Sequence, residues 1–579
     1  MSSSSSSPPP SKRAKTLPSW GPAPDPALLD RVSPLFRQIN DPERDPLNPP
    51  EAMPESVTEP GVLEAHTRPF PAARLFNLFD QAMLQQVRDE IKLEVFSQKS
   101  NDLYHFLQSS LDLKSSKLPG VSAIRDVVYS EEFTGMISRL VGVPLDSKRV
   151  DMSAHRYAQT NYLLCHDDEL DSRRVAYIIY LVDEDWDAAD GGALDMFDMD
   201  DSRQPRAVAR SFVPKWGSFA LFEVTPDSHH QVAEVLTASK ERISISGWFH
   251  SCREANPVRA RPTPVLEKPA VFPLAGTASS NAEAAEDSPL DVTEWISRPY
   301  LSARMAENIR SAFLGQGSIE LRQFLTPTAH GRVLGALAAR RRRLCEPGAA
   351  DCQVGPANRR HLRLLGSLGE GPGSAKEADA LDELMRLLAG ADFARLVGIL
   401  TGLADGSGAS ALAHRTAVSS LMFSHGDYTL VHDHVTEHEG LDLELSFVLP
   451  PLGAAEAEPA LDTAWPELAA GDDDDDESQS EDEDGPKQTS VGGELVYLTA
   501  DDTLLSSDPA PNNLLLVLRT EGVMRFTRYL SVLTARDPST AGTCPKLVSR
   551  PVPDGYCHVR VGLTFIPATE EAEEESQEK

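Results

Sequence analysis

The chain has 579 residues, with 88 Asp and Glu against 55 Lys and Arg, which gives a net charge of −33. At about 100–200 residues per domain, this length excludes a single small domain and indicates two to four. The six cysteines form no CxxC pair, which argues against both a disulfide framework and a thiolate zinc site. No signal-peptide core and no run of about twenty apolar residues is present. We therefore expect a soluble intracellular protein without a membrane partner.

Much of the negative charge is concentrated in two low-complexity segments. Ten acidic residues and no basic one lie between Asp472 and Asp484, and the last ten residues contain six Glu and one Lys. Like charges at this density repel one another and stay solvated. The sequence therefore predicts an acidic insertion at 471–485 and an acidic tail at 568–579.

The N-terminal part, residues 1–60, is rich in Ser and Pro and lacks periodic apolar positions, so we expect a disordered tail. Its basic cluster, Lys12-Arg13-Ala14-Lys15, fits a nuclear import signal or a solvated patch. A folded domain is predicted over residues 61–253. There Asp80 can cap a helix whose apolar residues recur at helical spacing, namely Met83, Val87 and Ile91.

Three runs of β-branched and aromatic residues follow in this domain, at 175–182, 218–222 and 242–249. Gly, Pro and Asp turns separate them, a pattern typical of an antiparallel β sandwich or barrel. Residues 254–290 are rich in Pro, Ala and Glu and are predicted to be a linker. The last domain, 291–567, is expected to be helical to about 420 and strand-rich beyond.

The second half of the chain resembles the first. Tyr162-Leu163-Leu164-Cys165-His166-Asp167-Asp168 is similar to Tyr428-Thr429-Leu430-Val431-His432-Asp433-His434, and Gly191-Gly192-Ala193-Leu194 is similar to Gly492-Gly493-Glu494-Leu495. An internal duplication is the economical explanation, with the acidic run as an insertion in the second copy.

A candidate metal site lies in the first copy. His166 and Asp168 are two residues apart in a segment that we expect to be extended, so both side chains point to the same face. His229 or His230 could supply a third ligand, and two imidazoles with one carboxylate are typical of non-haem Fe(II) oxygenases. Arg242, at the start of a strand, could hold a carboxylate in bidentate fashion. A hydrogen-bonded His–Asp pair in the core is the alternative.

The second copy retains little of this set. His432 matches His166, but His434 stands in place of Asp168, His558 in place of Arg242, and the region of Arg525 offers no His. We expect a noncatalytic platform for substrate, partner or dimer contacts. The basic run Arg340–Arg343 could contact RNA or an acidic protein, or be a solvated helix end. No direct nucleic-acid-binding motif is present.

These motifs resemble the Ofd/Tpa-type 2-oxoglutarate and Fe(II) dependent prolyl hydroxylases, a ribosomal prolyl hydroxylase family with fungal members. The similarity rests on residues 162–170, 173–181, 191–194, 214–216, 222–224, 230–232 and 242–250. It implies a mainly β protein with flanking helices (α+β), in which two tandem double-stranded β-helix (jelly-roll) domains follow one another. The first would be catalytic and the second degenerate.

The resemblance also implies residue roles. It makes His166, Asp168 and His230 the iron ligands. His230 is preferred to His229 because the family's distal ligand is the His immediately before Gln-Val. Arg242 and Tyr180 would bind the far carboxylate of 2-oxoglutarate, and Tyr157 matches another tyrosine of that pocket. Trp248 and Leu163 would wall the pocket. Beyond the iron centre no separate catalytic residue is implied, and Cys165 is expected to pack on the opposite face.

The family implies Fe(2+), 2-oxoglutarate and O2, with ascorbate in support, and a location in nucleus and cytoplasm. The expected reaction is prolyl 3-hydroxylation or 3,4-dihydroxylation of a small-subunit ribosomal protein, which would affect translation accuracy or termination. The alternative is an oxygen-sensing regulatory protein whose C-terminal domain controls the stability of a transcription factor. A third reading is a cupin-like metal-binding fold without oxygenase activity, which Arg242 disfavours.

Overall fold

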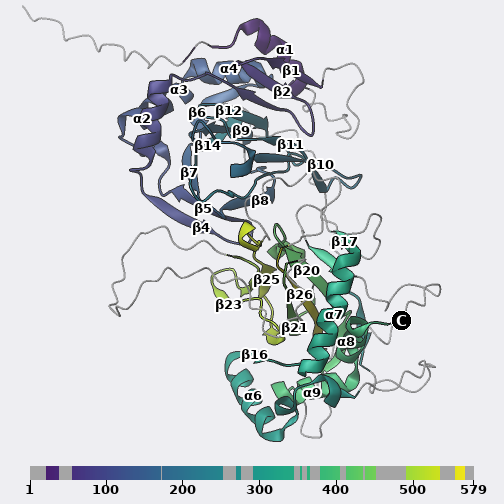
Figure 1. Ribbon diagram of the computed structural model, residues 1–579. Coiled ribbons are helices and arrows are strands. Elements are labelled where there is room, and N and C mark those ends of the chain that lie inside the picture. The colour runs from purple at the N-terminus through teal and green to yellow at the C-terminus, as the bar shows by residue number, and fades with distance from the viewer. Residues whose placement is uncertain are drawn as a thin grey trace, which may run out of the picture.

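A computed structural model describes residues 21, 23–37, 55–170, 172–251, 269–274, 291–344, 352–354, 361–364, 378–403, 412–434, 437–451, 491–534 and 555–567. The predicted basic cluster at 12–15, the acidic insertion 471–485 and the tail 568–579 lie outside these residues. We call residues 21–251 the N-terminal region and residues 269–567 the C-terminal region. Figure 1 shows the two regions one above the other, each with its own strands and helices.

The N-terminal region is a large antiparallel sheet flanked on one side by helices. Its path runs β1-β2-β3-β12-β9-β14-β7-β5-β8-β13-β10-β11, with β4 on β5 and β6 on β14. The elements are α1 (Pro26–Arg37), β1 (Ser56–Glu59), β2 (Leu63–His66), β3 (Ala72–Leu75), α2 (Gln81–Ile91), β4 (Phe96–Ser100), β5 (Tyr104–Ser109), α3 (Pro119–Val128), α4 (Glu131–Val141), β6 (Leu145–Val150), β7 (Ser153–Tyr157), β8 (Tyr162–His166), β9 (Arg173–Tyr180), β10 (Leu194–Met199), β11 (Pro205–Phe212), β12 (Phe219–Glu223), β13 (His230–Val232) and β14 (Arg242–Ser251).

The helix predicted after Asp80 is α2, and its first turn is capped because the Asp80 carboxylate accepts a hydrogen bond from the Met83 amide. Val87 and Ile91 are fully buried. The prediction of a disordered tail over 1–60 is wrong for residues 26–37, which form α1, and for residues 56–59, which form β1 and pair with β2. This helix buries Leu29, Val32 and Phe36 against the same core as α4. An amphipathic stripe on so short a helix, interrupted by Pro34, was obscured by the Ser and Pro content around it.

The C-terminal region repeats this arrangement with more helices. Its main sheet runs β16-β24-β21-β26-β20-β18-β17, with β19 on β26 and β15 on β19, and a separate sheet runs β23-β22-β25. The elements are β15 (Val271–Pro273), α5 (Val292–Trp295), α6 (Ala303–Gln316), β16 (Ser318–Arg322), α7 (Pro327–Leu344), β17 (Cys352–Val354), β18 (Leu362–Leu364), α8 (Ala380–Ala389), α9 (Ala391–Thr401), β19 (Leu412–Thr416), β20 (Ser419–Ser424), β21 (Gly440–Leu449), β22 (Leu495–Leu498), β23 (Thr503–Ser507), β24 (Asn513–Arg519), β25 (Met524–Thr527) and β26 (Cys557–Pro567).

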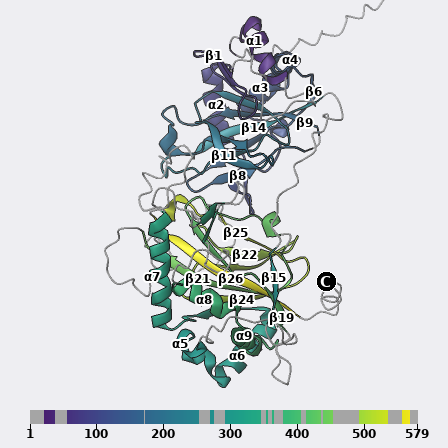
Figure 2. The ribbon, with the colours of Figure 1, turned by 90° about the vertical axis from the view of Figure 1, so that its right-hand side faces the viewer.

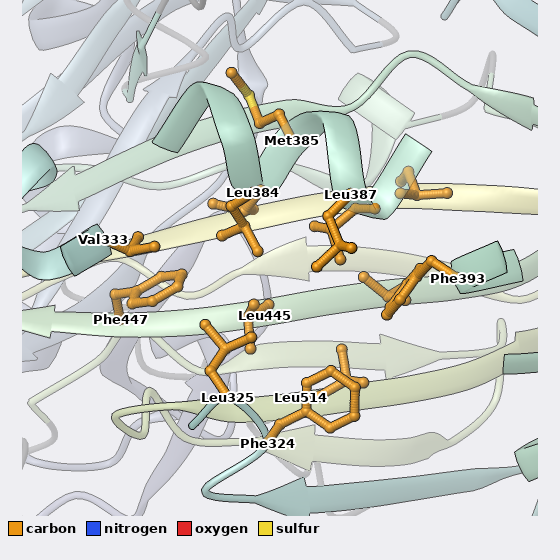
Figure 3. Packing of buried hydrophobic residues seen from close by; sticks show 14 of the residues in the cluster. Phe324, Leu325, Val333, Leu384, Met385, Leu387, Phe393, Leu445, Phe447 and Leu514 are labelled. Atoms are coloured by element: carbon orange, nitrogen blue, oxygen red, sulfur yellow. The ribbon is translucent and has the colours of Figure 1, made fainter. Parts of the chain in front are cut away.

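Helices α7, α8 and α9 cover one face of this sheet (Figures 1 and 2). Between them lies a core in which Leu384 and Leu387 of α8 meet the apolar face of the sheet, including Leu445 and Leu514 (Figure 3). Two predictions need correction here. The predicted linker 254–290 contains β15, which pairs with β19, and the predicted helical stretch contains β16, whose strand partner β24 is nearly 200 residues farther along the chain.

Strand register relates the two regions position by position. β14 sets Arg242 opposite Tyr157 and Ser244 opposite Tyr180. β26 sets His558 opposite Phe423 and Arg560 opposite Ser446. The sequence separation between Tyr157 and Phe423, and that between Tyr180 and Ser446, equals the separation between Tyr162 and Tyr428. This register agrees with the predicted duplication and places His558 at the position of Arg242.

The two regions meet through the duplicated segments themselves. Tyr162 and Leu164 form one buried cluster with their counterparts Tyr428 and Leu430. The ring of Tyr529 lies 4.4 Å from that of Tyr162, centroid to centroid. Equivalent surfaces that face each other in this way are typical of an isologous, two-fold contact. In Figure 1, β8 and β5 line the side of the N-terminal region nearest β25.

Among the described residues, none of the helices is both long and apolar enough to cross a membrane.

Candidate active site

Three predicted ligands come together on neighbouring strands. β13 pairs with β8 so that His230 lies directly opposite His166. Asp168 follows β8 by two residues, and its two carboxylate oxygens lie 3.5 Å from Nε2 of His166 and of His230. One ligand atom from each residue lies within 4.8 Å of the others. This spacing fits one small cation held on one face by two imidazoles and a carboxylate.

The protonation of His230 and Asp168 suits a metal. Burial lowers the pKa of His230 to about 4, so its imidazole is neutral near pH 7. Burial alone would raise the pKa of Asp168, but His230, His166 and Trp248 together hold it well below its usual range. Burial also opposes protonation of His166, although the hydrogen bond to Asp168 leaves its pKa raised. Asp168 is therefore an anion in a buried place, where a bound cation would compensate it.

The remaining ring nitrogens fix the orientation of the two imidazoles. Nδ1 of His166 lies 2.7 Å from the Leu164 carbonyl, and Nδ1 of His230 lies 2.9 Å from the Ser228 carbonyl. A ring nitrogen that donates to a carbonyl leaves Nε2 free of hydrogen and able to bind a metal. His229, the alternative third ligand, is not part of the cluster, so the structure favours His230.

Arg242 is the predicted partner for a ligand carboxylate, and it is 1% exposed. Its Nε donates to the Gly192 carbonyl at 2.7 Å, and Nη1 lies 3.3 Å from the Ser244 hydroxyl. The guanidinium lies 5.0 Å from the ring of Tyr157 and 5.1 Å from that of Tyr180. Both predicted tyrosines therefore flank the arginine that they were expected to assist.

Two polar atoms beside this site, Nη2 of Arg242 and the hydroxyl of Tyr180, form no well-aligned hydrogen bond among the described residues, although burial raises the pKa of Tyr180 and Arg242 lies close enough to oppose that rise. A buried donor left without a partner costs about 1–3 kcal/mol, so such a pair is best explained by a ligand. An arginine and a tyrosine hydroxyl together match a carboxylate. The residues present thus fit both an iron ion and the far carboxylate of a keto acid.

The two predicted wall residues take different places. Trp248 does more than line the pocket, because its Nε1 donates to Asp168 at 3.0 Å and its ring stacks under Arg173, whose guanidinium carbon lies 3.6 Å from the ring centroid. Leu163 packs half-buried against the pocket's apolar cluster. Cys165 is buried beside Phe197 on the other face, as its spacing predicts.

Sequence reasoning missed two features. The Gly192 carbonyl that anchors Arg242 belongs to the Gly-Gly motif, which marked the duplication but not the site. Glu234, four residues after His230, accepts hydrogen bonds from the C-terminal region. No sequence motif pointed to this residue.

The C-terminal region places different residues at the same positions. β25 pairs with β22 as β13 pairs with β10, so Arg525 occupies the position of His230. Its guanidinium donates to Glu437 and Glu444 at 2.8–2.9 Å. His434, in the place of Asp168, binds Glu437 and Thr429. Among the described residues of this region no group of metal-ligating side chains is found.

The predicted basic surface at Arg340–Arg343 is partly wrong. Arg340 is buried and paired with Asp379 and Asp382, and Arg341 is 2% exposed and donates to the Pro450 and Gly555 carbonyls. These two arginines fasten α7 to its neighbours and are withdrawn from any RNA.

Comparisons with known proteins agree with this geometry. Residues 152–250 match the 2OG-Fe(II) oxygenase superfamily, and residues 288–538 match a domain described as oxoglutarate and iron-dependent oxygenase degradation C-term. The chain is 38% identical to prolyl 3-hydroxylase OGFOD1 of Xenopus laevis over 48% of this chain and 51% of that one. It is 33% identical to prolyl 3,4-dihydroxylase OGFOD1 of Ostreococcus tauri over 45% and 54%.

A longer match is to prolyl 3-hydroxylase sudestada1 of Drosophila melanogaster, at 28% identity over 80% of each chain. The chain thus spans about half the length of the first two relatives and four-fifths of the third.

Proposed function

We propose that the chain hydroxylates a prolyl residue of a protein substrate, and the match of residues 152–250 to the 2OG-Fe(II) oxygenase superfamily supports this. The observation that carries the proposal is the convergence of His166, Asp168 and His230 near the buried Arg242 and Tyr180, with Tyr157 interacting with Asp168, Arg242 and Tyr180. The relatives' names, prolyl 3-hydroxylase and prolyl 3,4-dihydroxylase, supply the substrate residue.

We further propose that both regions are double-stranded β-helices. The support is the shared order of strands. β14 lies between β7 and β9, and β26 lies between their counterparts β20 and β21. The N-terminal copy would be the catalytic domain and the C-terminal copy a noncatalytic one.

In this proposal each side chain has one task. His166, Asp168 and His230 would hold Fe(2+), and Arg242 with Tyr180 would hold the far carboxylate of 2-oxoglutarate, which positions its keto acid end toward the ligands. When bound, the iron and 2-oxoglutarate supply the activation of O2, with succinate and carbon dioxide formed as one prolyl C–H becomes C–OH. Trp248 orients Asp168, and Tyr157 with Tyr180 excludes water from Arg242.

A small-subunit ribosomal protein is our proposed substrate, on the strength of the family resemblance. The test is mass spectrometry of the small ribosomal subunit from cells with and without the full chain. A gain of one or two oxygens on a single proline is expected with the chain. A purified reaction with Fe(2+), 2-oxoglutarate and the corresponding peptide should yield the same product and an equal amount of succinate. Succinate without peptide oxidation would contradict the substrate, and its absence would contradict the reaction.

A second candidate is a binding role for the C-terminal region, which keeps a complete core without a metal-ligating set among its described residues. In this role it would engage a regulator of a transcription factor. An interaction that survives His166→Ala would support the binding role, whereas one lost with this substitution would contradict it.

A further inference from the structure

One carboxylate of the N-terminal region is bound by the C-terminal region. Glu234 lies two residues after β13, and its side chain is 2% exposed. It accepts hydrogen bonds from Nε2 of His425 at 2.8 Å, from the Tyr529 hydroxyl at 3.2 Å and from the Val532 amide at 2.8 Å. All three donors belong to the C-terminal region. A buried carboxylate that receives three hydrogen bonds is held far more firmly than a surface ion pair.

The backbone of Glu234 contacts the turn that anchors Arg242. The Gly192 amide donates to the Glu234 carbonyl at 3.0 Å, and the Gly192 carbonyl accepts from Nε of Arg242 at 2.7 Å. The amides of Ala233 and Leu236 donate to the Ala193 and Asp190 carbonyls at 2.9 Å. Residues 233–236 and 190–193 are therefore joined as a short irregular ladder.

The turn leaves no room for adjustment. Gly191 and Gly192 have φ of +74° and +67°, in the left-handed region that favours glycine. A Cβ on Gly191 would lie 2.2 Å from the Glu234 carbonyl oxygen, and one on Gly192 would lie 2.7 Å from Cδ of Arg242. The Glu234 backbone is therefore packed closely against this turn, and the Gly192 hydrogen bonds connect it to the guanidinium.

We propose that Glu234 is a positioning residue through which the C-terminal region fixes Arg242 for its ligand. The proposal rests on the proposed function and deepens it, since it makes the noncatalytic region part of the 2-oxoglutarate site. The Glu234 carboxylate accepts hydrogen bonds from the C-terminal region, and its backbone carbonyl reaches Arg242 through Gly192.

The test uses the full chain loaded with Mn(2+) and measures 2-oxoglutarate binding by calorimetry. Glu234→Ala removes the three hydrogen bonds that its carboxylate accepts from the C-terminal region and is expected to raise the dissociation constant for 2-oxoglutarate about tenfold or more. The matched control is Asp102→Ala, which also removes an interdomain hydrogen bond, from the Val431 amide at 2.9 Å, but which does not contact the Gly191–Gly192 turn. This control should bind within about twofold of the wild type.

A second measurement separates positioning from loss of folding. Hydrogen exchange of the Gly192 amide should accelerate in Glu234→Ala and not in Asp102→Ala. If Glu234→Ala does not fold, the double variant His425→Gln and Tyr529→Phe changes only the opposite side of the contact and should raise the dissociation constant about threefold. Folded variants that bind 2-oxoglutarate within twofold of the wild type would overturn the inference. Failure of the wild type to bind would instead overturn the proposed function.

Discussion

The two regions differ in the charge that they place at equivalent positions of their sheets. At the position of His230, the N-terminal region has a neutral imidazole beside the buried anion Asp168, and this anion calls for an external cation. At the same position the C-terminal region has Arg525. Burial disfavours its charge, but Glu437 and Asp442 raise its pKa well above the usual value. The guanidinium of Arg525 therefore occupies, in the C-terminal region, the position that the candidate metal ligand His230 has in the N-terminal region. The comparison shows that replacing His230 by Arg525 and Asp168 by His434, with Glu437 and Glu444 nearby, gives an ion-pair network where the other copy has a candidate metal site.

The largest expected difference between the copies is in metal-dependent turnover. Asp168→Ala removes the only carboxylate of the ligand set and should lower iron-dependent succinate formation by at least about 100-fold. The equivalent change, His434→Ala, should leave succinate formation within about twofold. Iron analysis should find one ion per wild-type chain and a greatly reduced content in Asp168→Ala. Two ions per chain would contradict the loss of the second site.

The second expected effect is on stability and belongs to the C-terminal copy alone. Arg525→Met removes a buried cation that donates to Glu437 and Glu444 and lies 3.5 Å from Asp442. Arg519 still pairs with Asp442 and Glu437, so the loss of compensation is largest at Glu444. We expect the free energy of unfolding of this region to fall by about 3–5 kcal/mol, measured by urea denaturation. Arg395→Met, which breaks an exposed pair with Asp392, is the control and should cost less than about 1 kcal/mol. Equal losses in the two variants would show that Arg525 does not balance the acids.

The third effect concerns the ligand carboxylate. Arg242→Lys keeps the positive charge but loses the planar fork and the bond from Nε to Gly192. The KM for 2-oxoglutarate should rise about 30-fold, equivalent to about 2 kcal/mol, while the KM for the peptide changes little. Steady-state kinetics with each substrate varied in turn makes the measurement. A parallel rise in both KM values would indicate general damage to the pocket.

The duplication explains which parts of this comparison could be predicted from sequence. His166, Asp168 and His230 were found because residue type, spacing and a family motif point to the same chemistry, and α2 was found because its cap and apolar period are local. The sequence placed the counterpart of His230 only in the region of Arg525, because the exact position depends on the pairing of β25 with β22 and no residue there resembles β13. Glu234 was missed for a similar reason, since its three partners lie nearly 200 to 300 residues farther along the chain.

The smallest expected effect concerns Tyr180, whose counterpart in the C-terminal region is Ser446. Tyr180→Phe deletes one buried hydroxyl that forms no well-aligned hydrogen bond among the described residues, so the stability of the folded protein should change little. Binding should suffer, because a ligand carboxylate would lose one hydrogen bond, worth about 1 kcal/mol, or about a fivefold rise in the KM for 2-oxoglutarate. Ser446→Ala should change neither quantity measurably. A higher KM without a loss of stability would show that the hydroxyl binds a ligand. If the hydroxyl only packs, its removal would leave the KM unchanged.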